Sequence, residues 1–223
     1  MNIINKIIFF FVREFKVSIK NISDLFINII FFILAIFIFI FSIGPDKEVL
    51  NLTGIGMLWT LLLLSFTLSL KRYYQEDFEN GSLIIIHMGG LSYELIVILK
   101  ILSHFIFVQL PFLIIIPFAS LFVNLRYEQL ILLLLSFFIG SLILSCLGSI
   151  SASMNLLNKR NFTLGSLIVM IFSIPIIIFS LGLVNAEENF SYFINILLGI
   201  LLIFFAISPW TSAQCIKLAL ANN

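Results

Sequence analysis

The charged side chains of this chain are concentrated in one short stretch. In the segment KRYYQEDFENGSL, residues 71 to 83, five of thirteen positions are charged, although the whole 223-residue chain holds only 12 Lys and Arg and 11 Asp and Glu. Three of the five are carboxylates, at Glu76, Asp77 and Glu79. Such a cluster suits a basic groove on a partner protein, although each exposed ion pair contributes only about 0–1 kcal/mol.

Two further ionisable side chains lie inside an apolar run. Lys100 and His104 form a Lys-x-x-x-His pair one helical turn apart, and ionisable groups within a membrane span are candidates for function by default. Gating of a transport path is the functional interpretation. The structural alternative is that Lys100 extends to the membrane interface and that His104 hydrogen-bonds to a neighbouring helix. The other histidine, His87, is expected to be solvated.

No spacing in the sequence is typical of a catalytic or metal site. Cys146 and Cys215 are far apart and lie in or at the end of apolar runs, so we interpret them as small buried residues. The sequence contains no GxxxxGK[ST] motif for binding phosphate and no cluster of His, Asp or Ser residues for catalysis. We therefore predict no catalytic residue, no metal site and no enzymatic activity of the chain itself.

The elements that position these residues are expected to be membrane helices. The chain is 61% hydrophobic and 10% charged, with a mean hydropathy of +1.21, whereas soluble domains are about half apolar and a quarter charged. Lipid must therefore surround most of it. We predict a single-domain, all-α integral membrane protein over residues 1–223, with six transmembrane helices. Their expected ranges are 25–43, 53–70, 95–122, 129–152, 163–184 and 192–214.

A further helix is expected before the first span. Over residues 1–24 the apolar side chains fall mainly on one side of a helix, and the cations fall on the other side: Lys6, Arg13, Lys16 and Lys20. We interpret this segment as an amphipathic helix in the membrane interface, with its cations toward anionic lipid headgroups. The alternative is an ordinary lead-in segment with no special role.

Prolines and small residues mark two of the predicted spans. Pro111 and Pro117 interrupt the long third span, and a proline removes a helix hydrogen bond and permits a kink. In the fourth span, the run GSLILSCLGSISAS at 140–153 is rich in small residues that let another helix approach closely. We therefore expect a bend in the third span, with its two prolines as candidate gating residues, and close packing around the fourth span.

The distribution of Lys and Arg predicts which side of the membrane each connection faces. With the N-terminus inside, only Lys47 and Arg126 lie outside, and nine lie on the cytoplasmic side. The nine are Lys6, Arg13, Lys16, Lys20, Lys71, Arg72, Lys159, Arg160 and Lys217. Both termini and the stretch 71–94 are then cytoplasmic. A bacterial inner membrane is the predicted location, and a mitochondrial inner membrane is the alternative.

The cytoplasmic stretch after the second span is the candidate site of action. It is too polar to enter lipid and too short to form a domain, and Gly81 can end a helix. A short docking helix for a soluble partner and a plain solvated loop are equally compatible with the spacing. If the stretch docks a partner, Tyr73, Tyr74 and Phe78 are the expected hot spots, because aromatic residues dominate such interfaces.

Ordered features along almost the whole chain carry a resemblance to one family. They are Ser-Ile-Gly-Pro at 42–45, Trp59, Leu64-Ser65, Arg72, Asp77, Gly81-Ser82-Leu83, Lys100, His104, Pro111, Pro117, Arg160, Pro175 and Ser208-Pro209. In this order and spacing they resemble heme exporter protein B (CcmB-type), the membrane subunit of the ABC-type complex that serves cytochrome c maturation. The chain departs from that family at 87–92, where HMGGLS replaces a stretch that usually contains proline.

The resemblance implies a fold and a set of partners. It implies a type 2 ABC exporter-like arrangement, in which the segment between the second and third spans is a coupling helix that docks a separate cytoplasmic ATPase dimer. The implied docking residues are Arg72, Tyr73, Tyr74, Glu76, Asp77, Phe78, Glu79, Gly81 and Ser82. Other implied partners are further cytochrome c maturation membrane subunits and a heme chaperone. A net charge of +1 gives no reason to expect nucleic acid.

The resemblance also places the cofactors outside this subunit. ATP is expected on the partner, and heme is expected as cargo of the complex. In one view the complex exports heme. In the other, which we favour, ATP hydrolysis releases a heme-loaded periplasmic chaperone from a companion membrane protein. Axial ligation of heme by His104 is a further interpretation.

Other classes of protein compete with this interpretation. They are a non-transporting assembly scaffold, the membrane subunit of another ABC exporter, a secondary transporter and a membrane-embedded enzyme. A secondary transporter is disfavoured, because Glu94 and Glu128 lie at span ends and no acidic residue is expected at mid-membrane.

Overall fold

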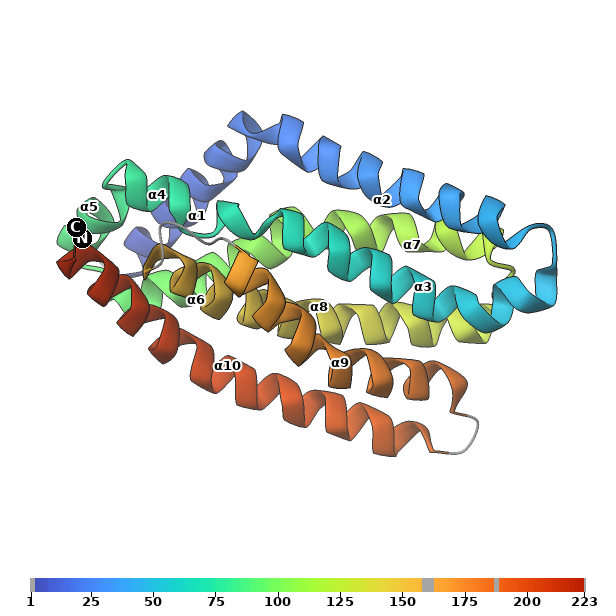
Figure 1. The fold of residues 1–223 in the computed structure, drawn as a ribbon. Helices are drawn as coiled ribbons and strands as arrows, with labels where there is room; N and C mark the ends of the chain where they lie inside the picture. Colours follow the sequence, from blue (N-terminus) through green and yellow to red (C-terminus); the bar gives the residue numbers. More distant parts are fainter. Residues whose placement is uncertain (1–2, 158–162, 187–188, 223) are drawn as a thin grey trace.

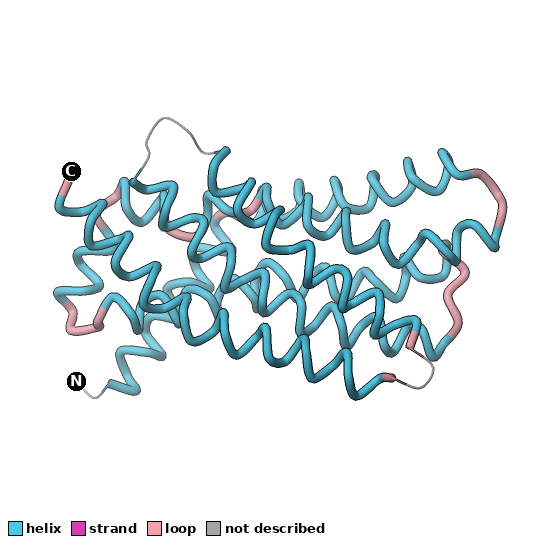
Figure 2. Tube along the Cα trace, turned by 60° about the horizontal axis from the view of Figure 1, so that its bottom comes forward, coloured by secondary structure: helices cyan, strands magenta, loops and turns pink. Residues whose placement is uncertain are grey.

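The computed structural model describes residues 3–157, 163–186 and 189–222, in which every regular element is a helix (Figure 1 and Figure 2). In chain order these are α1 Ile3–Lys20, α2 Ile22–Ile43, α3 Lys47–Leu68, η1 Leu70–Arg72, α4 Gln75–Glu79, α5 Ser82–Met88, α6 Tyr93–His104, η2 Phe105–Gln109, α7 Leu110–Phe122, α8 Tyr127–Leu157, α9 Thr163–Asn185 and α10 Phe190–Ala221. Both chain ends lie at the same end of the bundle, which we call the terminal end (Figure 1).

Six helical segments are long and apolar enough to cross a membrane, which confirms the prediction of an all-α integral membrane protein. They are Ile22–Ile43, Lys47–Leu68, Tyr93–Phe122, Tyr127–Leu157, Gly165–Asn185 and Phe190–Ala221. The predicted spans have this number and order, but the fourth and sixth helices continue past their predicted ends at 152 and 214. At 31 and 32 residues, they exceed the ~20 residues that cross the hydrocarbon core, so their last turns project at the terminal end.

α8 is the central helix of the bundle and packs against α3, α9 and α10. The run of small residues at 140–153 provides this packing. Gly140 lies against the indole of Trp59 on α3, a buried ring that also packs on Phe137 with ring centroids 4.4 Å apart. Buried serines recur every four residues along the run, at Ser141, Ser145, Ser149 and Ser153. These small side chains allow the close helix approach that the sequence predicts.

The third span changes its helical pitch near the middle. α6 ends at His104, η2 is a π-helix over Phe105–Gln109, and α7 continues from Leu110. Pro111 follows directly, and a proline both lacks an N–H and clashes with the carbonyl four residues before it. The wider π turn accommodates a residue of this kind, so the chain stays helical through both Pro111 and Pro117. The predicted interruption is therefore a local widening of the helix.

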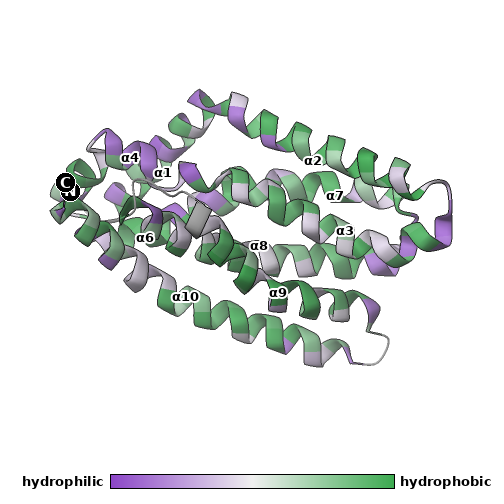
Figure 3. Ribbon diagram, in the orientation of Figure 1, coloured by the Kyte–Doolittle hydropathy of each residue, from purple (hydrophilic) through white to green (hydrophobic). Residues whose placement is uncertain are grey.

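α1 lies across the terminal end of the bundle, at an angle to the spans (Figure 1). It exposes an apolar strip formed by Ile4, Ile8, Val12, Phe15 and Ile19. Its opposite side buries Phe10 and Glu14. Figure 3 shows hydrophilic residues gathered on α1 and α4 and at the far loops, with hydrophobic residues along the spans. The amphipathic pattern is present as predicted, but α1 ends at Lys20, because the chain turns at Asn21 before α2.

Candidate functional site

The segment between the second and third spans folds as two short helices at the terminal end (Figure 1). We call residues 70–88 the connecting segment. Gly81 separates α4 from α5 with a φ of 67°, a left-handed conformation that glycine adopts without strain. The stretch is therefore helical and is not a plain loop. The backbone of Arg72 lies in η1, whereas its side chain, like Lys159 and Arg160, lies outside the described residues.

Two tyrosines fix the connecting segment to α8. The Tyr73 hydroxyl donates to the backbone carbonyl of Ser145 at 2.7 Å, and the Tyr74 hydroxyl hydrogen-bonds to the Ser149 hydroxyl at 2.7 Å. Both rings are buried, and so is Phe78. The prediction that these three aromatic side chains form a contact surface for a partner is therefore wrong. Their large apolar rings instead fill the core of the protein itself, where burial is favourable.

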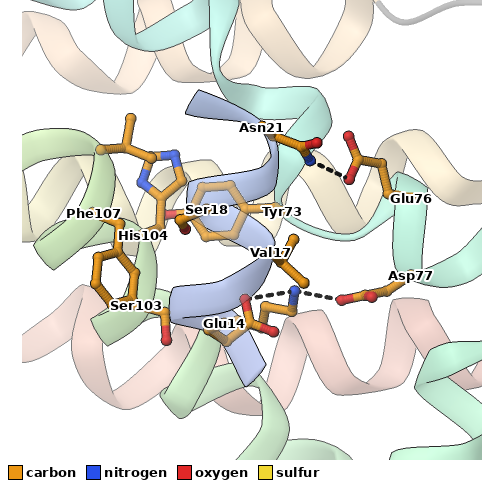
Figure 4. A pocket seen from close by; sticks show the side chains of 12 residues that line it. Glu14, Val17, Ser18, Asn21, Tyr73, Glu76, Asp77, Ser103, His104 and Phe107 are labelled. Atoms are coloured by element: carbon orange, nitrogen blue, oxygen red, sulfur yellow. Dashed lines mark hydrogen bonds and ion pairs between the residues drawn. The ribbon is translucent and has the colours of Figure 1, made fainter. Parts of the chain in front are cut away.

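Asp77 also turns inward, and it joins a cluster of four charged side chains. Its carboxylate accepts from Arg13 on α1 and pairs with Lys100 on α6. Lys100 Nζ also lies 3.0 Å from Glu14 Oε2, and Arg13 Nη1 lies 2.6 Å from Glu14 Oε1. We call these four residues the charge cluster; Figure 4 shows its two carboxylates, Glu14 and Asp77, facing each other. Two cations alternate with two carboxylates, so the cluster joins α1, α4 and α6 without net charge.

The charge cluster is largely shielded from solvent. Lys100 is 5% exposed, and Glu14 and Asp77 are each 7% exposed. The structural alternative for Lys100 and the expectation for Arg13 are therefore both wrong. Lys100 does not extend to the membrane interface, because two carboxylates hold its ammonium inside the protein. Arg13 faces α4 instead of lipid headgroups, because Asp77 offers it a fixed and partly desolvated anion.

The charge cluster determines how Asp77 titrates. Burial raises the pKa of the Asp77 carboxyl, but the charge of Lys100 and the hydrogen bond from Arg13 outweigh burial and hold that pKa below its ordinary value. A carboxyl with a depressed folded pKa contributes stability above its unfolded pKa. That contribution is lost as the pH falls through the folded pKa.

We predict that acid destabilises the protein through Asp77. Stability should decrease as the pH falls through the ordinary carboxyl range and below it, and Asp77→Asn should flatten this decrease, because the variant has no carboxylate to protonate. Thermal unfolding of the purified protein between neutral and acid pH measures the effect. Glu79→Gln, which removes an exposed carboxylate of the same helix, is the control for net charge. A wild-type pH profile in Asp77→Asn would contradict the prediction.

His104 contacts the connecting segment one helical turn from Lys100 of the charge cluster. Its ring stacks on Tyr73 with centroids 4.0 Å apart, and its Nε2 lies 3.1 Å from the Ser69 hydroxyl at the end of α3. A cavity of ≈ 50 Å³, large enough for water, lies beside these groups and is also lined by Glu14 and Lys100 (Figure 4). The structure therefore brings together two sets of residues that lie apart in the sequence, the pair Lys100 and His104 and the connecting segment.

Pro111 and Pro117 do not join the charge cluster. They lie in α7, beyond the π turn η2.

The sequence alone gives no reason to single out Gln109, the last residue of η2. Its side chain is 1% exposed, and its amide atoms have no hydrogen-bond partner within the described part of the chain. Glu14 was also missed. A signal for it existed, because it is the one acidic residue among the first 23, on a helix whose other charges are cations.

The outward side of the connecting segment differs from its inward side. Its exposed members, which we call the outer face, are Lys71, Glu76, Glu79, Asn80, Ile84, Ile85, His87 and Met88. Asn21 donates to Glu76 at 3.0 Å and thereby orients one of these carboxylates. Ile85 and Met88 are 68% and 81% exposed. Exposed apolar side chains of this kind mark an interaction surface, either for a protein or for the membrane.

Within the described ranges, no group of three or more His, Cys, Asp and Glu side chains could hold a metal ion. His87 is exposed, as the sequence predicts. Its Nδ1 lies 2.9 Å from the carbonyl of Leu91, and its ring stacks on Tyr93. These contacts fix the turn between α5 and α6.

Comparison with known proteins points to one family. Residues 5–219 match the family described as CcmB protein. The chain is 28% identical to heme exporter protein B of Haemophilus influenzae over 213 residues, which cover 94% of this chain and 96% of the relative. The protein of the same name from Pseudomonas aeruginosa is 29% identical over 164 residues, 74% of each chain. The one from Bradyrhizobium diazoefficiens is 27% identical over 209 residues, 92% of this chain and 94% of the relative.

Proposed function

Because this chain belongs to the CcmB family, we propose that it is the membrane subunit of an ABC-type complex for cytochrome c maturation in a bacterial inner membrane. In this proposal the terminal end faces the cytoplasm, as the excess of Lys and Arg at that end predicts. A separate cytoplasmic ATPase binds there. ATP belongs to this partner, since the sequence of the membrane subunit has no phosphate-binding motif.

The observation that carries the proposal is the two-sided character of the connecting segment. Its inner side is fixed to the membrane helices through Tyr73, Tyr74 and Asp77. Its outer face presents carboxylates and apolar side chains. A coupling helix needs both kinds of contact, because it must bind the ATPase and move the spans. The docking surface is therefore the outer face, in place of the buried aromatic residues that the sequence suggested.

The charge cluster provides the route from the ATPase to the spans. A displacement of α4 moves Asp77, which is paired with Lys100 in the third span. His104 lies one turn further along that span and is stacked on Tyr73 of the connecting segment. The π turn and Pro111 follow in the same helix, and helices kink mainly at features of these two kinds. We therefore propose that the third span responds by bending near η2, with Pro117 further along the same route.

For the cargo, we favour release of a heme-loaded chaperone over passage of heme through this subunit. His104 contacts the Ser69 hydroxyl and the Tyr73 ring, which supports a mechanical role for it over axial ligation of heme. Heme is then cargo of the complex, and the work supplied by the ATPase acts on a neighbouring membrane subunit. Heme export by the complex remains the other view of the same coupling.

Met88→Asp tests the docking surface. Because Met88 is 81% exposed, the substitution should leave the fold intact. We expect it to weaken binding of the ATPase by about tenfold or more, since a few apolar anchors carry most of the energy of an interface. Co-purification of the two subunits and the ATP hydrolysis rate of the complex measure the effect, with Met88→Leu as the matched control.

Two results would argue against the proposal. Unchanged ATPase binding in Met88→Asp would show that the outer face is not the docking surface. If the ATPase binds but hydrolyses ATP at the same rate with and without this subunit, the subunit is a non-transporting scaffold.

A further inference from the structure

A groove between α1 and α5 lies beside the outer face. It encloses ≈ 590 Å³, and its walls are formed mainly by Phe9 and Phe10 of α1 and by Ile85 and Ile86 of α5. Lys6 stands at its rim, together with the already paired Arg13, and none of the described residues that line it is acidic. The groove is therefore apolar inside and cationic at its edge.

The groove lies away from the apolar strip of α1. At 100° per residue, Phe9 projects about 100° from the centre of the strip that contains Ile4, Ile8 and Val12. Phe9 is nevertheless 70% exposed, and Ile85, on the opposite wall, is 68% exposed. The strip is the side that an interfacial helix gives to lipid. Exposed apolar side chains mark an interaction site. Because this site lies off the lipid-facing strip and next to the outer face, a protein occupant fits it better than lipid does.

The rim charges indicate what the occupant carries. Arg13 is already paired with Asp77 and Glu14. Lys6 forms no ion pair with any residue of the described ranges, and its ammonium lies over the backbone at Gly90, in the space that a Cβ there would fill. Within the described part of the chain, the groove thus has an apolar surface beside one unpaired cation, Lys6. The complementary occupant is an apolar side chain next to a carboxylate.

We infer that the groove is a second contact site for the ATPase, which inserts an apolar side chain between α1 and α5 and places a carboxylate on Lys6. This inference rests on the proposed function. It is also supported by continuity, because Ile85 belongs to both the groove and the outer face. The ATPase then holds α1 as well as α5. Since α1 carries Arg13 and Glu14, the partner acts on the charge cluster from two elements at once.

The test uses the full-length chain in complex with its ATP-binding subunit. Phe9→Ala should weaken ATPase binding by about tenfold, which is the loss typical of a buried aromatic anchor. Ile8→Ala shortens a 56% exposed side chain on the apolar strip and should leave binding unchanged. Lys6→Gln should weaken binding by about two- to fivefold and make it less sensitive to salt. Lys16→Gln, an exposed cation outside the groove, should do neither.

Two results would overturn the inference while leaving the proposed function in place. In the first, Met88→Asp releases the ATPase, but Phe9→Ala and Lys6→Gln bind it as tightly as the wild type. In the second, the protein without its ATPase is placed in phosphatidylglycerol nanodiscs, and native mass spectrometry shows bound phospholipid on the wild type but not on Phe9→Ala or Lys6→Gln. ATPase binding by these two variants is unchanged. The groove is then a lipid site. Thermal unfolding of each variant excludes misfolding as the cause.

Discussion

Replacing Lys100 with methionine should destabilise the protein by about 3–5 kcal/mol, the range observed when one partner of a buried ion pair is removed. Lys100 is 5% exposed and pairs with both Asp77 and Glu14. Without its ammonium, two buried carboxylates share the single guanidinium of Arg13. Methionine has nearly the same length as lysine, so the loss of charge dominates over any loss of packing. Unfolding in mixed micelles at neutral pH measures the change.

Lys217→Met is the matched control. Lys217 pairs with Glu94 at 2.7 Å, but the two side chains are 41% and 38% exposed. An exposed pair of this kind contributes about 0–1 kcal/mol, so its loss should cost much less than the loss of Lys100. Equal costs for the two variants would show that water or the remaining partners compensate the charge cluster. In that case the cluster does not hold α1, α4 and α6 together.

The double variant Lys100→Met with Glu14→Gln separates stability from coupling. It removes one cation and one anion, so Asp77 keeps Arg13 as a balanced partner and much of the lost stability should return. The route from α4 to the third span, however, is still cut. We expect a folded protein that binds the ATPase without stimulating ATP hydrolysis. Full stimulation in the double variant would place the coupling route elsewhere.

The sequence alone predicts the membrane architecture well, because each relevant signal is local. Hydropathy locates six spans, and the small residues at 140–153 predict the close contacts of α8. The sequence also identifies Lys100 and His104 as candidate functional residues, since ionisable residues are rare in apolar runs. The π turn next to Pro111 is less predictable, because a proline is compatible with a kink, a break or a wider turn.

The inward side of the connecting segment could not be predicted in the same way. α4 has only five residues, too few for a periodic pattern to show which side is buried. The decision depends on partners far away in the sequence. Asp77 pairs with Arg13 and Lys100, and Tyr73 reaches Ser145. Without those partners in view, an acidic and aromatic stretch is as compatible with an exposed docking surface as with a buried anchor.

Gly148→Val should have the second large effect, because it pushes α8 away from α3 and from the connecting segment. A Cβ at this position would overlap the end of the Phe66 ring and lie 3.1 Å from Tyr73 Cε2. Phe66 and Tyr73 are both buried, so neither ring has free space to move into. Overpacking of a dense core costs about 1–3 kcal/mol, and we expect a value near the top of this range. The same unfolding measurement in mixed micelles applies.

Two variants show whether the cause is local overlap. Gly199→Val makes the same substitution in α10, where a Cβ would meet nothing within 4 Å, and it should be nearly neutral. Gly148→Val combined with Phe66→Ala removes the ring that the new side chain strikes, so it should cost less than the sum of the two single variants. If the stability losses of the two single variants add up in the double variant, close packing against Phe66 does not explain the effect. Gly148 would then matter through helix flexibility. Tyr73 lies beside Gly148 and donates a hydrogen bond to Ser145 one turn away, so it fixes the connecting segment to α8 at this point. If close packing is the explanation, Gly148→Val should disturb this contact. It should then lower the ATP hydrolysis rate of the complex, even at temperatures where the variant remains folded.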